Sequence, residues 1–376
     1  MAEKTSTSTT SRTKSQTMQA PPSDSRPMPP AGKSIFDAIP VSMVLFLAKP
    51  YLAGETAAEA LALSQKLYDD FKYSSTLDIL GEDAQAESDC DASVEHYKEL
   101  ISLIAQHPMK LSQAIAEERR QPTVSFKPSM FATKAPVKEG TAFQVRSKEL
   151  DLAYNRIETV VAFAEERGVR VTLEAEDHRW TDFHLETYFA LIESGYKNVG
   201  TVLQTRLFRT KKDLARFDER MRTRLVIGIY NEPASLAHTA KPVMKDLLVD
   251  YARELMARGT YVEVATHDTK CLASFFAAAI TDKVDPSRFE TQFLHGVPRK
   301  RFQESLISGR LFEGEEYRQL RENHEYLQKL AREGVLVRMY LPFGEGKVAG
   351  AYCRRRLKEN PNMVTYGIKN LLKLGE

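Results

Sequence analysis

The sequence predicts an α/β fold, a (β/α)8 TIM-type barrel that follows an N-terminal helical arm and a disordered leader. Short β-branched segments alternate with longer amphipathic segments eight times over roughly 280 residues, the pattern of parallel strands joined by helical crossovers. The chain of 376 residues accommodates one such barrel together with extensions. An open doubly wound sheet is the alternative, but the glycine-rich dinucleotide fingerprint follows none of the predicted strands, which favours the barrel.

The first residues have a composition unlike the rest. Residues 1–33 are rich in Ser, Thr and Pro and contain no branched aliphatic side chain, so we expect a disordered leader. Its basic residues leave a targeting peptide as the alternative, although acidic residues are also present and no amphipathic helix is visible. Residues 34–74 are expected to form the helical arm, with a helix at Glu55–Phe71, and residues 75–376 the barrel.

The barrel elements follow in order, each strand enriched in β-branched residues and each helix with apolar residues three or four positions apart. The strands are expected at Ser75–Gly81, Thr123–Met130, Val169–Glu176, Asn198–Thr205, Arg224–Tyr230, Tyr261–His267, Phe289–Gly296 and Val335–Phe343. The helices are expected within Ala92–His107, at Ser147–Arg167, Asp182–Ser194, Lys211–Met221, Pro242–Arg258 and Thr269–Ile280, through Leu306, at Tyr317–Arg332, and near Ala349–Glu359.

Composition excludes several classes of protein. Hydrophobic residues make up 42% and charged residues 28%, and the net charge of +2 gives no basic field that would favour nucleic-acid binding. Cys90, Cys271 and Cys353 share no metal or redox spacing, which argues against a disulfide scaffold or zinc finger and for a reducing compartment. The longest apolar run, Met43–Ala48, is too short to span a bilayer, so we expect any membrane contact to be peripheral.

Polar residues gather where the predicted strands end, the face that carries function in such barrels. They are Lys127, Glu174, Glu176, Asp177, Gln204, Arg224, Tyr230, Thr266, His267, Gln292, His295, Arg338, Tyr340, Arg354, Arg355, Arg356 and Glu359. Each has an ordinary structural explanation, such as an ion pair between Lys127 and Glu174. Together they are costly to bury without partners or a charged ligand.

These residue types indicate a small cyclic carboxylate as ligand. Adjacent arginines can hold a carboxylate with two parallel charge-assisted bonds, and Tyr230 and Tyr340 can enclose a small ring. No Ser–His–Asp or Cys–His order supports acyl transfer, and the histidines lack metal spacing. The segment Gly344–Lys347 lacks the P-loop pattern and is interpreted as a turn between strand and helix.

Several motifs, in the same order, resemble those of the proline dehydrogenase family over about residues 50–375. RLVIGIY is similar to the family's RLVKGAY, VATHD to ATHN or ATHD, and RFETQFLHG to FEFQxLYG. VRMYLPFG is similar to VRxYVPYG, and YCRRRLKEN to YLxRRLxEN. The stretch from Tyr51 to Asp83 looks like the family's N-terminal helix running into its first strand. Methylenetetrahydrofolate reductases have a related barrel, but the paired arginines and RMYLPFG favour proline.

The resemblance implies a flavoprotein that oxidises L-proline to Δ1-pyrroline-5-carboxylate by hydride transfer to N5 of FAD, with a quinone as the next electron acceptor. Carried over by motif, Glu174 and Arg224 would be the catalytic residues, with Arg224 close to N5 and Glu174 paired with Lys127. Substrate contacts would come from Lys127, Tyr230, Leu294, Tyr340, Arg355 and Arg356. Cofactor contacts would come from Ala175, Gln204, Arg224, Ile227, Gly228, Ile229, Thr266, His267 and Glu359.

Four of the departures from the family pattern concern the expected site. Ile227 stands where the motif has lysine, Ile229 where it has alanine, Glu174 where it has aspartate, and His295 where it has tyrosine. These changes leave open a different cyclic amino acid, such as hydroxyproline, or a degenerate barrel that binds proline without turnover. We expect a cytoplasmic protein, or a mitochondrial one in a eukaryote, with peripheral membrane contact near Val41–Ala48.

Overall fold

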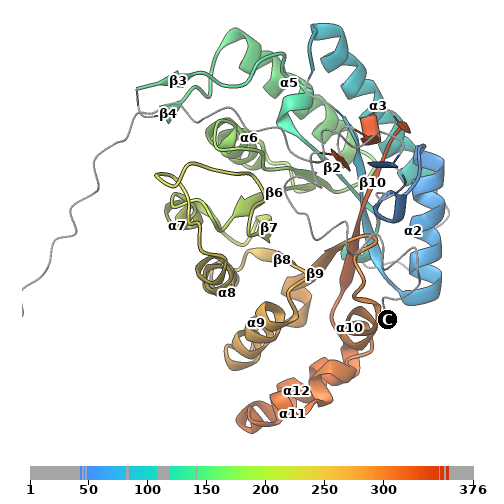
Figure 1. Ribbon diagram of the computed structural model, residues 1–376, viewed down its shortest axis with the longest axis vertical. Coiled ribbons are helices and arrows are strands. Elements are labelled where there is room, and N and C mark those ends of the chain that lie inside the picture. Colours follow the sequence, from blue (N-terminus) through green and yellow to red (C-terminus); the bar gives the residue numbers. More distant parts are fainter. Residues whose placement is uncertain are drawn as a thin grey trace, which may run out of the picture. The chain divides into compact units, whose positions relative to one another are not determined.

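Among the described residues, eight parallel strands close into a barrel, which confirms the predicted fold class (Figure 1). In chain order they are β1 (Ser74–Ile79), β2 (Thr123–Phe126), β5 (Val171–Leu173), β6 (Val199–Gln204), β7 (Arg222–Val226), β8 (Tyr261–Ala265), β9 (Phe289–Leu294) and β10 (Val337–Phe343). Strand β1 pairs with β2 on one side and with β10 on the other, so the first and last strands close the barrel. Each strand overlaps the segment predicted for it.

The computed structural model describes residues 43–44, 46, 49–81, 84–107, 118–140, 142–346, 348–350 and 353–354. All of them belong to one unit, Ser34–Glu376. The predicted leader, and Arg355, Arg356 and Glu359 among the predicted site residues, lie outside the described residues.

The helices lie around the barrel strands (Figure 1). They are α2 (Ala57–Phe71), α3 (Glu87–Gln106), α5 (Lys148–Glu165), α6 (Thr181–Glu193), α7 (Thr210–Asp213), α8 (Lys241–Ala257), α9 (Thr269–Thr281), α10 (Lys300–Ile307), α11 (Glu315–Arg318) and α12 (His324–Glu333).

Local sequence explains where several helices begin. At α2, the Thr56 hydroxyl accepts from the Glu59 amide and the Glu59 carboxylate accepts from the Thr56 amide, a capping box. At α9, the Asp268 carboxylate accepts from the Cys271 amide at 2.9 Å. Asp268 closes the VATHD motif, so the end of that motif directly starts the next helix.

Two helical predictions are wrong in extent. The helix expected at Lys211–Met221 is the short α7 and one 3-10 turn, because Phe217 adopts an extended backbone and packs its ring on Tyr188 and Phe189. The helix expected at Tyr317–Arg332 is divided into α11 and α12 by a 3-10 turn at Arg321–Asn323.

Two further differences lie in the strands. Strand β7 ends at Val226 rather than Tyr230, because Gly228 takes a positive φ of 92° and turns the chain. A short antiparallel hairpin, β3 (Lys138–Glu139) with β4 (Ala142–Phe143), lies between β2 and α5 and was not predicted.

The barrel strands separate apolar from charged side chains. In β8, Val262 and Val264 belong to the apolar core, while Glu263 between them contacts polar side chains of β7 and β9. Arg222 of β7 extends across β6 to the Thr172 hydroxyl of β5 at 3.0 Å. It can do so because Gly200 of β6 has no side chain, and a Cβ there would lie 2.5 Å from the guanidinium carbon. The space enclosed by the barrel strands therefore contains charged side chains, among them Arg222 and Glu263.

Candidate active site at the barrel mouth

The mouth is the end of the barrel at which the strands terminate, and here it comprises Lys127, Glu174, Gln204, Arg224, Leu294 and Tyr340. These residues lie in, or directly follow, six different strands of the closed barrel. Lys127, Gln204 and Arg224 are buried, and the other three are half-buried. Charged side chains buried in this way need partners or a ligand.

Arg224 is the central cation of the mouth. Its Nη1 donates to Glu174 Oε1 at 2.5 Å, and its guanidinium carbon lies 5.1 Å from the centre of the Tyr340 ring. Burial acts to lower the pKa of Arg224, but the carboxylates of Glu174 and Glu263 outweigh burial and raise it. Arg224 therefore stays charged, while its Nε and Nη2 are buried without a hydrogen-bond partner.

Lys127 has a different carboxylate partner from the one expected. The Glu174 amide donates to the Phe126 carbonyl at 2.9 Å, so Glu174 lies beside Lys127 along the sheet. Yet Lys127 Nζ lies 3.5 Å from Asp78 Oδ2 of β1, and Glu174 pairs with Arg224. The predicted Lys127–Glu174 ion pair is wrong, and Asp78, inside the predicted strand STLDILG, is a mouth residue that the sequence analysis missed.

Gln204 and the RLVIGIY glycine form one side of the mouth. Gln204 Nε2 donates to the Glu176 carbonyl at 2.8 Å. A Cβ at Gly228 would lie 2.6 Å from Gln204 Oε1 and 3.0 Å from Arg206 Cδ, so a side chain there would displace both. The Arg206 amide donates to the Ile227 carbonyl at 3.1 Å, and its Nε and Nη1 are buried without a hydrogen-bond partner.

The VATHD motif contributes a neutral histidine. His267 Nε2 accepts from the Leu294 amide at 3.3 Å, which leaves the proton on Nδ1. Burial, assisted by Arg299, lowers the pKa of His267 to about 4. Its Nδ1 is buried without a partner and is therefore an available hydrogen-bond donor. The neighbouring Thr266 hydroxyl accepts from the Asp268 amide at 3.2 Å.

The remaining predicted site residues fall into two groups. Ala175 directly follows Glu174, and Ile227, Ile229 and Tyr230 lie in the loop after β7, with Ile229 40% exposed. Arg355, Arg356 and Glu359 lie outside the described residues, so their predicted roles stay predictions.

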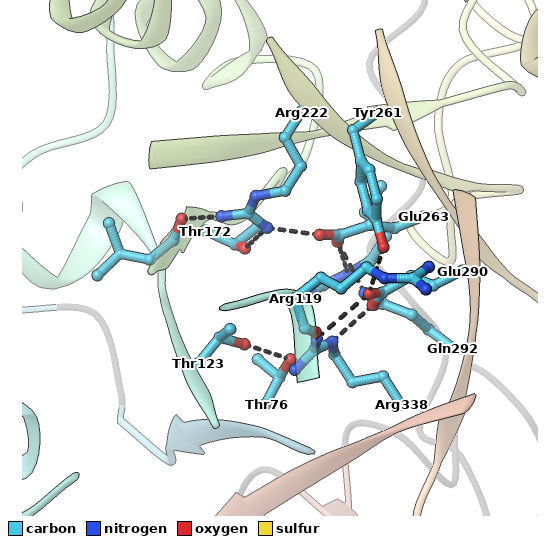
Figure 2. Close-up of polar contacts among 12 residues, drawn as sticks. Thr76, Arg119, Thr123, Thr172, Arg222, Tyr261, Glu263, Glu290, Gln292 and Arg338 are labelled. Carbon is cyan, nitrogen blue, oxygen red and sulfur yellow. Dashed lines mark hydrogen bonds and ion pairs between the residues drawn. The ribbon is translucent and has the colours of Figure 1, made fainter. Parts of the chain in front are cut away.

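Two residues expected at the mouth belong instead to a charged cluster deeper in the barrel. This cluster, the inner network, comprises Arg222, Glu263, Glu290, Gln292 and Arg338, and Figure 2 shows their side chains pointing toward one another. Arg338 donates to the carbonyls of Gln121 and Arg119, which precede β2, so it lies toward the opposite end of the barrel from the mouth.

The inner network is held together by short contacts. Arg338 Nε donates to Glu290 Oε1 at 2.5 Å, and Gln292 Nε2 bridges Glu290 and Glu263 at 2.7 Å to each. Arg222 Nη1 donates to Glu263 Oε1 at 2.5 Å. Glu263 and Arg222 carried no signal recognised in the sequence, although a glutamate between two strand valines marks a charged face.

Two features are absent from the part of the chain that the structure describes. Within the described residues, no helix combines the length and the apolar character needed to cross a membrane. Within the same residues, His, Cys, Asp and Glu form no group of three or more that could bind a metal ion.

Comparison with known proteins indicates one family. A family model described as Proline dehydrogenase matches residues 60–232 and 242–365. The proline dehydrogenase of Deinococcus radiodurans is 29% identical over 332 residues, which cover 87% of this chain and 90% of that protein. Proline dehydrogenase 1 of Bacillus subtilis (strain 168) is 26% identical, with coverage of 87% and 91%.

A solved structure shares the fold. Proline utilization A (PutA) from Bdellovibrio bacteriovorus, inactivated by N-propargylglycine, superposes with a TM-score of 0.68 at 22% sequence identity. The superposition covers 84% of this chain and 33% of that chain, so this chain spans about a third of the solved protein. The arrangement of strands and helices described above is therefore shared with a part of that larger protein.

Proposed function

The chain belongs to the proline dehydrogenase family, and we propose that it oxidises L-proline to Δ1-pyrroline-5-carboxylate at the barrel mouth, with FAD as cofactor. This reaction is the first step of proline catabolism to glutamate. The observation that carries the proposal is the buried Arg224 guanidinium, which Glu174 and Tyr340 hold while two of its nitrogens keep no hydrogen-bond partner. A preorganised cation of this kind stabilises negative charge that develops during a reaction.

The residues of the mouth fit a flavin. Buried donors without partners occur on Arg224, His267 and Arg206, and the carbonyl and phosphate oxygens of FAD are acceptors for such donors. Gln204, Thr266 and the backbone near Ala175, Gly228 and Ile229 would complete the cofactor contacts. When bound, FAD supplies the acceptor for the hydride, while the protein positions and tunes it.

Arg206 can supply the positive charge that the family lysine, replaced by Ile227 in RLVIGIY, would otherwise provide. Its stem contacts the position of Gly228, and its amide is hydrogen-bonded to Ile227, the residue that replaces the family lysine. Burial lowers the pKa of Arg206, with Glu232 acting in the opposite direction, so an anionic ligand would stabilise its charge. We assign Arg206 to the FAD diphosphate.

Substrate binding uses the other side of the mouth. Lys127 has a buried ammonium group that would contact the proline carboxylate. The predicted contacts of Arg355 and Arg356 would add charge-assisted hydrogen bonds from two guanidinium groups. The Ser125 hydroxyl donates to the Tyr340 hydroxyl at 3.3 Å, which fixes the ring that would pack on the pyrrolidine beside Leu294. Tyr230 would complete this enclosure from the loop after β7.

These side chains orient the substrate rather than exchange protons with it. The oxidation needs a neutral amine, because the nitrogen lone pair forms the C=N bond as hydride leaves the adjacent ring carbon. Cations on the carboxylate and an aromatic ring on one face hold that carbon in a reactive geometry. Glu174 keeps Arg224 in place while these contacts form.

The acceptor after FAD is proposed to be a quinone, reached at a membrane surface from the cytoplasmic side. Met43 and Phe46 are 53% and 58% exposed, whereas Val44 is buried and packs with Tyr51 and Leu80. Exposed apolar side chains next to an anchored one suit peripheral contact with a bilayer.

Anaerobic mixing of the purified, FAD-reconstituted chain with L-proline tests the proposal. We expect a yellow protein whose flavin absorbance bleaches on addition of L-proline and recovers with a quinone. A protein that takes up no FAD would overturn it, and reduction without repeated turnover would instead support a degenerate barrel. The same measurement with hydroxyproline in place of L-proline tests the alternative substrate, which the replacement of the family alanine by Ile229 leaves open.

A matched pair of variants tests the carboxylate contact. Arg355→Met is expected to raise the KM for L-proline at least tenfold, because a charge-assisted bond contributes about 1.5–3 kcal/mol. Arg354→Met removes the neighbouring arginine of the same run and is expected to leave KM within twofold. Equal KM values for both variants would refute the assignment of Arg355.

A further inference from the structure

Glu263 lies directly beside the central cation of the mouth. Strands β7 and β8 pair so that Arg224 and Glu263 are register partners. Arg224 Nε lies 3.6 Å from Glu263 Oε2, and the Glu263 side chain is 2% exposed. Since facing residues on paired strands interact, Glu263 is the second carboxylate that faces the Arg224 guanidinium, after Glu174.

Glu263 also separates two cations of the same strand. Arg222 and Arg224 lie two residues apart in β7, and both contact carboxylates in the barrel interior. Glu263 contacts both of them, with Oε1 2.5 Å from Arg222 and Oε2 near Arg224. Without this carboxylate, two buried guanidinium groups would repel each other through a medium of low polarity.

The rest of the inner network holds Glu263 still. Gln292 Nε2 donates to its Oε2 at 2.7 Å and in turn contacts Glu290, which Arg338 and Tyr261 hold (Figure 2). Burial acts to raise the pKa of Glu263, but Arg222, Arg224 and Arg338 outweigh burial and lower it to about 2. The carboxylate is therefore fixed in position and ionised.

We propose that Glu263 is a positioning residue for the oxidation, which holds the Arg224 guanidinium at the floor of the mouth and sets how much positive charge reaches the bound flavin. This inference rests on the proposed function. Arg224 between Glu174 and Glu263 has its charge largely offset, whereas Arg224 beside Glu174 alone presents more of it. Loss of the Glu263 charge stabilises the anionic reduced cofactor and releases the guanidinium from its fixed place beside the cofactor.

Glu263→Gln and its matched control Glu290→Gln test this proposal in the FAD-loaded chain. Both substitutions remove one buried negative charge of the inner network, but only Glu263 contacts Arg224. For Glu263→Gln we expect the ratio of reduced to oxidised flavin at a fixed potential to rise at least tenfold, which is about 30 mV for a two-electron couple. For Glu290→Gln we expect less than a threefold change. Spectroelectrochemical titration measures both without turnover.

Kinetics supply a second readout. We expect Glu263→Gln to lower kcat at least tenfold with the KM for L-proline within twofold, because other residues hold the carboxylate. Glu263→Asp, which keeps the charge but withdraws it from Arg224, is expected to shift the redox ratio at least threefold in the same direction, and it carries the test if Glu263→Gln does not fold.

One set of results would overturn the role of Glu263 alone, and another would also overturn the proposed function. Equal redox shifts in Glu263→Gln and Glu290→Gln, or no shift in a folded Glu263→Asp, would show that Glu263 acts only as part of a structural network. In that case the unaltered chain still bleaches with L-proline and the proposed function stands. An unaltered chain that binds no flavin would overturn both.

Discussion

The inner network and the mouth contain the same kinds of residue, arginines and carboxylates on neighbouring strands, but they differ in how completely the charges are satisfied. Arg338 donates to Glu290 and to three backbone carbonyls, and no buried polar atom of the inner network is left without a hydrogen-bond partner. Arg224 in the mouth, and Arg206 and His267 just after strands β6 and β8, all keep buried nitrogens that lack a hydrogen-bond partner.

This difference separates charges that hold the fold from charges that are ready for a ligand. A buried charge with a complete set of partners has nothing left to bind. A buried donor without a partner is costly to maintain, and a ligand with matching acceptors can remove that cost. We therefore propose that the barrel contains a structural layer, the inner network, and a binding layer, the mouth, with Glu263 between them.

The largest expected effect comes from breaking the inner network. Arg338→Met leaves the Glu290 carboxylate buried without its cation and removes the donor to the Ser75 and Gln121 carbonyls. We expect the free energy of unfolding to fall by about 3–5 kcal/mol. Urea denaturation of the full chain measures this loss.

An exposed ion pair supplies the control for that experiment. Arg253 and Asp282 are 2.7 Å apart, with side chains 47% and 33% exposed. Arg253→Met is expected to cost at most about 1 kcal/mol. Similar losses in both variants would show that the inner network is no more structural than a surface pair.

The next largest effect is expected in the mouth, on activity. Arg224→Met removes the cation that we propose faces the reaction, and we expect kcat to fall about 100- to 1,000-fold. Arg224→Lys keeps the charge but cannot reach Glu174 and Glu263 together, so it should recover only part of the rate. Steady-state kinetics with L-proline measure both variants, and an unchanged kcat in Arg224→Met would contradict the division into two layers.

As the pH falls, we expect the stabilising contribution of His267 to be lost before that of Glu263 in the inner network. Burial, with Arg299, lowers the pKa of His267 to about 4, so its neutral form stabilises the fold fully above pH 6.5, and this contribution is lost as the pH falls toward 4. The pKa of Glu263 is about 2, where the arginines outweigh burial, so its contribution is lost only below pH 4.5.

Urea denaturation at a series of pH values measures this order. Between pH 6.5 and 4 we expect His267 to account for a loss on the order of 3 kcal/mol in the free energy of unfolding. His267→Asn should make the decline shallower in that range and leave the decline below pH 4 unchanged. A free energy of unfolding that stays constant from pH 7 to 4.5 would contradict this prediction.

The smallest effect is expected at Arg206. Arg206→Met should weaken FAD binding about tenfold, because one charge-assisted bond is lost. Arg179→Met, which removes an exposed arginine paired with Asp177, should leave affinity within twofold. Ile227→Lys added to Arg206→Met should restore binding, since it returns the family lysine. Fluorescence titration with FAD measures all three, and failure of the restoration would show that Arg206 does not replace that lysine.

Much of the fold could be predicted from the sequence. Every barrel strand overlaps its predicted segment, because β-branched runs between amphipathic helices are a local signal. The exceptions depend on distant contacts. The helix predicted at Lys211–Met221 ends early, where Phe217 packs on Tyr188 and Phe189. The sequence around Phe217 does not predict this packing. The hairpin β3–β4 is too short to leave a periodic trace.

The candidate site was predictable in its residues but not in its pairings. Lys127, Glu174, Gln204, Arg224 and Tyr340 were identified from strand ends and motifs, and each lies in or directly after a strand of the barrel. Of these five, the structure shows Arg224 in contact with Glu174 and Tyr340. The motifs could not show which carboxylate each cation contacts, since that depends on side chains from strands far apart in the chain.

By itself, the sequence determined the eight-strand alternation, the family and the kinds of residue available for chemistry. Only the tertiary structure decided that Lys127 pairs with Asp78, that Arg224 lies between Glu174 and Glu263, and that Arg338 belongs to the structural layer. The physical reason is that periodicity and propensity act over a few neighbouring residues. Ion pairing inside a barrel is set instead by the stagger and closure of the strands, which place distant residues side by side.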